Sequence, residues 1–150
     1  MKLYGKLFVI AAIGSAASAP LTAIAGHEFD GRDIVQGKAL YMEFCAACHG
    51  ENLEGQPNWQ LPNDDGILPA PPHDQSGHTW HHGNGLLFTY TALGGKAALA
   101  KRGFPDFKSG MPGFGEILSD DDIWTILAYI RSTWPQRIQS VQNVRNPPHK

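Results

Sequence analysis

The sequence lacks an excess of basic residues and carries few charges of either sign. Its 150 residues have a formal net charge of −2, and Asp, Glu, Lys and Arg make up 17% of them. A nucleic-acid partner is therefore not expected. The 17 glycines and 11 prolines indicate one compact domain that contains much loop.

A hydrophobic run long enough to span a membrane is also missing. The apolar run at residues 7–17 is short for a span, and it follows the basic residues Lys2 and Lys6. Together with the small-residue triplet at 23–25, it is typical of a secretory signal peptide over residues 1–25, which predicts a soluble protein exported to the periplasm. A retained anchor is the alternative, whereas no cysteine lies at the predicted cut to carry a lipid.

Cysteine is scarce, and both cysteines lie in one motif, Cys-Ala-Ala-Cys-His at residues 45–49. A thioredoxin-like redox pair would need a flanking βαβ pattern, for which we find no alternating or β-branched run. A zinc site could use His73 and His78, but the connection from Cys48 is longer than in common zinc fingers. In the third interpretation Cys45 and Cys48 bind a haem covalently, and the His49 imidazole points at the iron.

Helical patterns surround this motif. Apolar residues after a possible cap at Asp33 predict a helix that runs into residue 45, and a shorter helix is predicted at 86–93, opened by Asn84. The clearest helix follows Ser119, with three aspartates in its first turn, and is stopped by Pro135. We predict one domain at 26–135 and a loose, flexible tail at 136–150.

Methionine is scarce as well, and only Met42 and Met111 remain after the predicted signal. Met42 lies on the helix that leads into the motif and is predicted to be a core residue. Met111 lies in a loop where Gly110, Pro112 and Gly113 disfavour helix and strand and allow the backbone to approach a flat ligand. This placement makes Met111 the candidate for a sixth ligand to the iron.

The ordered set of motifs resembles the class I c-type cytochromes, from about Asp33 to Trp134. The segment 37–50 is similar to the first helix and haem attachment of that family, residues 111–114 to its methionine loop, and residues 118–131 to its last helix. The residues that match the helix crossing of the family are Gly37, Tyr41, Ile126 and Tyr129.

The resemblance implies an all-α cytochrome c fold, a few helices with long loops around one covalently bound haem c. Cys45 and Cys48 would form the thioethers, and His49 and Met111 would be the axial ligands of the iron. Pro71 best matches the proline whose loop supplies a backbone carbonyl to the proximal histidine.

The implied function is a one-electron shuttle, because two axial ligands leave no open position at the iron. Redox partner proteins would dock transiently at the exposed haem edge, ringed by Ala46, Ala47, Pro112 and Phe114. We expect a monomer that is not an enzyme, although it could serve an oxidoreductase as a subunit. A haem-based ligand sensor or haem enzyme, in which Met111 leaves the iron, is the alternative.

A histidine cluster departs from the family pattern. His73, His78, His81 and His82 lie within ten residues, so a copper-handling protein is a further alternative. The favoured interpretation is that Trp80 packs near the haem edge, while the histidines donate hydrogen bonds to haem propionates or to the backbone.

Overall fold

A computed structural model describes residues 27–146, and this range is helical without any strand. The prediction of an all-α fold is confirmed. The elements in chain order are η1 (His27–Phe29), α1 (Ile34–Phe44), α2 (Ala46–His49), η2 (Thr79–His81), α3 (Asn84–Leu93), α4 (Gly95–Ala100), α5 (Asp120–Ser132) and α6 (Gln136–Asn143).

Helix α1 begins where the sequence predicts it. The Asp33 side chain accepts hydrogen bonds from the backbone N–H groups of Val35 and Gln36, which satisfies two of the unpaired donors of the first turn. The helix ends at Phe44, and Cys45 is both its C-cap and the N-cap of α2. The Cys-Ala-Ala-Cys-His motif is therefore fixed to the end of α1.

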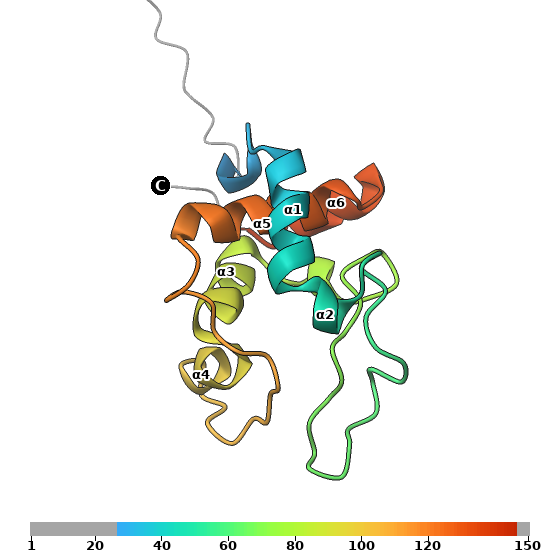
Figure 1. Ribbon diagram of the computed structural model, residues 1–150, viewed down its shortest axis with the longest axis vertical. Coiled ribbons are helices and arrows are strands. Elements are labelled where there is room, and N and C mark those ends of the chain that lie inside the picture. Colours follow the sequence, from blue (N-terminus) through green and yellow to red (C-terminus); the bar gives the residue numbers. More distant parts are fainter. Residues whose placement is uncertain (1–26, 147–150) are drawn as a thin grey trace, which may run out of the picture.

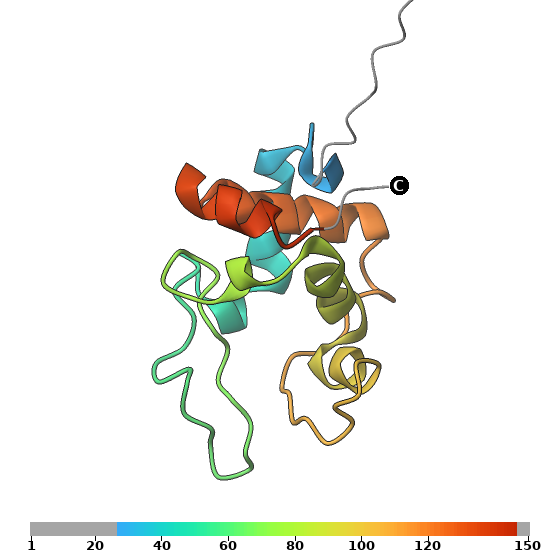
Figure 2. The same cartoon turned by 180° about the vertical axis from the view of Figure 1, so that it is seen from behind.

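The crossing of α1 and α5 forms the centre of the fold (Figures 1 and 2). Gly37 is buried there, and a Cβ at this position would lie 2.8 Å from the Cβ of Tyr129 and closer still to the Thr125 carbonyl oxygen. Tyr41 is fully buried, and its ring centroid lies 5.6 Å from that of Tyr129. The absence of a side chain at residue 37 thus allows the two helices to touch.

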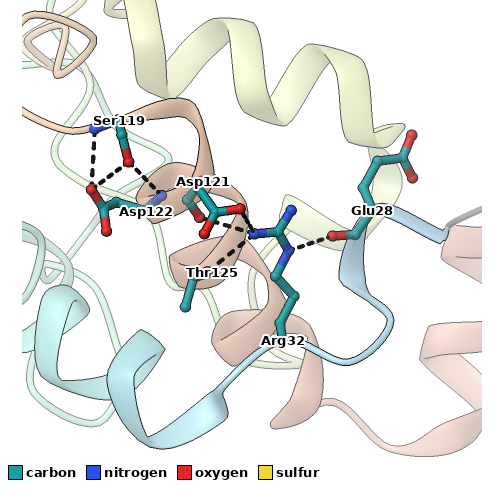
Figure 3. Close-up of polar contacts among 6 residues, drawn as sticks. All are labelled: Glu28, Arg32, Ser119, Asp121, Asp122 and Thr125. Carbon is teal, nitrogen blue, oxygen red and sulfur yellow. Dashed lines mark hydrogen bonds and ion pairs between the residues drawn. The ribbon is translucent and has the colours of Figure 1, made fainter.

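The start of α5 is fixed by polar contacts, which Figure 3 shows. Ser119 and Asp122 form a capping box, as each side chain bonds the backbone N–H of the other. Arg32 connects this helix to η1. Its guanidinium forms an ion pair with Asp121, and its Nε donates to the Glu28 carbonyl at 2.8 Å.

The segment after the predicted helix at 86–93 differs from the sequence interpretation. Helix α3 already begins at Asn84, and the glycine pair Gly94–Gly95 that follows it leads directly into α4. Gly94 has φ +80°, so the chain turns sharply there and a new helix begins at Gly95. The two short helices form one arm of the molecule, and the loop after α2 forms the other (Figure 1).

Residues 136–143 do not agree with the prediction of a loose tail. They form α6, in which Ile138 and Gln142 are buried. Gln142 Nε2 donates to Asn84 Oδ1 at 2.6 Å and to the His82 carbonyl at 3.2 Å, so α6 is joined to the start of α3. Pro135, predicted as a helix stop, is the N-cap of this additional helix.

Between residues 27 and 146, no helix is long and apolar enough to cross a membrane. The predicted signal peptide at residues 1–25 lies outside the described residues.

Candidate functional site

The Cys-Ala-Ala-Cys-His motif occupies one turn of helix, with its functional side chains in different environments. Cys45 is partly buried and Cys48 is exposed, and the two do not form a disulfide with each other. Burial raises the pKa of Cys45 to about 11, with a smaller contribution from Cys48. Cys45 therefore stays protonated at neutral pH. Its partner Cys48 faces solvent three residues later.

His49 is held in one orientation by the loop that follows it. Its Nδ1 lies 2.9 Å from the Pro71 carbonyl oxygen, the contact that the resemblance implies for Pro71. A carbonyl can only accept, so Nδ1 carries the proton and Nε2 keeps its lone pair for a metal. Burial lowers the pKa of His49, and the bond to Pro71 opposes this in part. The neutral imidazole, which is the ligating form, is thus favoured.

Hydrogen bonds close the long loop so that Pro71 reaches His49. Gly55 N–H donates to the His49 carbonyl at 2.7 Å, and Gln56 N–H donates to the Ala70 carbonyl at 2.8 Å. Gly55 has φ +68°, and a Cβ there would lie 2.6 Å from the Pro71 carbonyl carbon. The two ends of the loop therefore meet at a glycine that has no room for a side chain.

The Met111 segment is bound to the α3–α4 junction through its backbone. Gly95 N–H donates to the Met111 carbonyl at 3.1 Å, and Phe114 N–H donates to the Thr91 carbonyl at 3.0 Å. A Cβ on Gly94 would lie 2.7 Å from the backbone nitrogen of Gly113, so the two segments touch without side chains between them. Met111 itself is partly buried and borders an open hollow of about 360 Å³.

The two predicted axial ligands therefore come from different segments of the fold. His49 is at the end of α2, and Met111 is attached to the arm that contains α3 and α4. The side chains present fit a covalent haem: a pair of thiols, an adjacent neutral imidazole oriented by a carbonyl, and a thioether in a fixed loop.

Met42 is not the core residue that the sequence predicts. Its side chain is 38% exposed on α1. The face of α1 that packs against α5 contains Gly37 and Tyr41, and Met42 does not belong to this buried face.

The four clustered histidines do not all converge on one point. His73 stacks on His49, and His81 lies against Trp80. His78 stacks on Trp59 with ring centroids 5.2 Å apart and meets the His82 ring edge to face at 5.4 Å. Among the residues that the structure describes, no group of three or more His, Cys, Asp or Glu side chains is placed to hold a metal ion. The geometry thus gives the copper hypothesis no support.

Trp80 packs beside the core but is itself only partly buried. Its Nε1 donates to the Gln75 carbonyl at 3.3 Å, and its ring centroid lies 3.7 Å from that of His81. Contact between Trp80 and a haem stays a prediction.

Sequence reasoning missed the support behind His49, the predicted proximal ligand. The His73 ring stacks on His49 with centroids 4.0 Å apart, and its Nδ1 lies 2.8 Å from Thr79 Oγ1. Burial, together with His49 and His78, holds the pKa of His73 well below its usual value. The order Pro-Pro-His after the motif was the signal in the sequence, because it places a ring two residues beyond the carbonyl that binds His49.

Comparisons with known proteins identify the family of this chain. The family model for cytochrome c matches residues 34–134. A thiosulfate dehydrogenase of Stutzerimonas stutzeri (strain A1501) is 34% identical over 103 residues, which cover 68% of this chain but only 28% of that protein. No solved structure gives a significant match. Because the family match covers most of the chain and includes the haem-attachment motif, this protein belongs to the cytochrome c family, which implies covalently bound haem c and electron transfer.

Proposed function

We propose that the protein is a periplasmic one-electron carrier with a single haem c, attached through Cys45 and Cys48 and ligated by His49 and Met111. The observation that carries this proposal is the hydrogen bond from His49 Nδ1 to the Pro71 carbonyl, which leaves Nε2 for the iron. The bound group would supply an iron that changes between ferrous and ferric states, with a thioether ligand favouring the ferrous one.

A carrier is favoured over an enzyme or sensor because the Met111 segment is restrained on both sides of the ligand. The Met111 carbonyl accepts from Gly95, and the Met111 N–H donates to Ser109 Oγ at 3.2 Å. To withdraw the thioether, the chain would have to break these bonds or turn the side chain away. This restraint supports closed coordination, in which neither oxygen nor peroxide gains access to the metal.

The surface beside Met111 suggests the chemistry of a redox partner. Three exposed basic residues, Lys96, Lys101 and Arg102, lie on and after α4, and the next aromatic residue, Phe104, is 61% exposed. The chain as a whole is acidic, with a net charge of −2. A basic region next to an exposed aromatic ring fits an acidic protein surface, so docking should weaken as ionic strength rises.

The predicted docking edge needs one revision. Ala46 is only 8% exposed, so it cannot form part of the docking surface. Ala47 and Pro112 are exposed and Phe114 is partly buried, and the proposed contact region rests on these residues.

Met111→Ala tests the ligand assignment. The oxidised wild-type holoprotein should show the long-wavelength sulfur-to-iron absorption band, and the variant should lose it and have a lower reduction potential, because the thioether that favours ferrous iron is gone. Met42→Leu is the matched control, since Met42 lies exposed on α1 and should leave spectrum and potential unchanged. Retention of the band in Met111→Ala, with its loss in Met42→Leu, would refute the assignment.

A second candidate role rests on the likeness to a thiosulfate dehydrogenase. The matched region is 28% of that protein, so we propose that this chain could act as the electron-accepting haem unit beside a separate oxidoreductase. Thiosulfate added alone to the oxidised holoprotein should then leave it oxidised. Direct reduction by thiosulfate would show instead that the chain is itself an enzyme.

A further inference from the structure

Two hydrogen bonds fix the backbone of His73. Its N–H donates to the Leu53 carbonyl at 2.8 Å, and its carbonyl accepts from Trp134 Nε1 at 2.7 Å. Trp134 is 3% exposed, beyond the end of α5, and Leu53 is 4% exposed in the loop after the motif. These bonds connect the loop to the central helix pair and determine where the His73 ring can lie.

A hydrogen bond at one edge also fixes the His73 ring. Its Nδ1 and the Thr79 hydroxyl are 2.8 Å apart, and the same hydroxyl donates to the Pro72 carbonyl at 3.4 Å. Thr79 is 6% exposed, so water does not compete freely for these bonds. The Tyr41 ring meets His73 edge to face, with centroids 6.4 Å apart. The orientation of His73 is thus set by Thr79 and limited by Tyr41.

The flat face of this ring lies against the proximal imidazole. The His49 and His73 centroids are 4.0 Å apart and the ring planes differ by 20°. The hydrogen bond to Pro71 fixes one edge of His49, but a bond at one edge leaves the ring able to tilt about it. A parallel ring on its face opposes that tilt through close dispersion contact.

We propose that His73 is a positioning residue for His49, which sets the plane of the proximal imidazole relative to the haem by stacking on it. The inference rests on the proposed function, since it takes His49 as an iron ligand. His73 would act on the iron only through His49. Its effect is to reduce the range of ligand orientations, and hence to define a single electronic environment at the metal.

The test compares oxidised holoproteins by proton NMR, because the shifts of the haem methyl groups depend on the plane of the axial imidazole. His73→Leu keeps an apolar side chain but removes the flat ring, and we expect a changed spread of the methyl resonances. His73→Phe keeps a ring and should restore most of the wild-type pattern. Thr79→Val removes the hydrogen bond at nearly constant shape and should change the pattern less than His73→Leu.

Gln136→Leu is the control, since Gln136 is exposed on α6 and lies neither beside His49 nor in the proposed haem surroundings, and its methyl pattern should equal that of the wild type. A wild-type pattern in His73→Leu would overturn the proposal, even if that variant is less stable. If His73→Leu does not mature, an unchanged pattern in Thr79→Val overturns it instead. Loss of haem from wild-type protein on denaturation would refute the proposed function, and this is measured before any variant.

Discussion

Gly37→Ala should force α1 and α5 apart, because the structure leaves no volume for a methyl group between them. The new Cβ would lie 2.8 Å from the Tyr129 Cβ and 3.2 Å from the Thr125 carbonyl carbon, and closer still to the carbonyl oxygen. Ordinary carbon contacts are about 3.5–4.0 Å. One helix must therefore move, or Tyr129 must leave its position beside Tyr41.

The magnitude follows from two opposing effects. Overpacking a tight core costs about 1–3 kcal/mol, whereas replacing glycine by alanine inside a helix returns about 0.5–1 kcal/mol. Gly85→Ala provides the matched control, because Gly85 is also helical and a Cβ there would meet nothing within 4 Å. The helix-propensity gain is shared by the two variants, so their difference isolates the steric cost, about 1–3 kcal/mol.

Urea unfolding of the two holoproteins, followed by circular dichroism, measures this difference. Gly85→Ala should match or exceed the stability of the wild type, and Gly37→Ala should fall below that of Gly85→Ala. Equal midpoints and slopes for the two variants would refute the close approach of α1 and α5.

Three further predictions concern other parts of the molecule. Burial lowers the pKa of His82 from its usual 6.5, so the unfolded chain takes up a proton at a higher pH than the folded protein does. The free energy of unfolding should therefore fall as pH drops below 6.5. In unfolding titrations at several pH values, His82→Gln should flatten this dependence. Gln142→Ala should destabilise the protein by about 1–3 kcal/mol, since Asn84 and the His82 carbonyl lose a buried donor, while the exposed Gln136→Ala should change the urea midpoint little. Cys48→Ala should lower the yield of holoprotein that keeps its haem through acid-acetone extraction, and an unchanged yield would contradict the thioether assignment.

The parts of the fold that the sequence predicted are those governed by local chemistry. Asp33 and Ser119 start their helices by bonding to backbone groups two or three residues away, so a short stretch of sequence is enough to identify them. The helix crossing could be named because the order of motifs resembled a known family. Helix α4 was missed, since the Gly94–Gly95 pair has the composition of a helix stop and its use as a junction depends on contact with residue 113.

The surroundings of His49 were predictable only in part, because they depend on loop closure. The Pro71 carbonyl lies 22 residues from His49 in sequence and could be suggested only by the resemblance. The stacked His73 follows Pro71 by two residues, so its contact with His49 depends on the same closure of the loop. Helix α6 was taken for a tail because the segment is rich in Gln and Asn and shows no clear period, whereas the structure buries Ile138 together with one of these polar residues, Gln142.

The backbone bonds at the Met111 segment separate the ligand from the loop before it. Gly95 holds Met111 on one side and Thr91 holds Phe114 on the other, while residues 101–108 are all exposed. Insertions, deletions and changes of charge in that exposed loop can therefore accumulate without moving the thioether. In evolutionary terms, the proposed docking loop can change to suit another redox partner, while the position of Met111, the proposed distal ligand, is inherited unchanged.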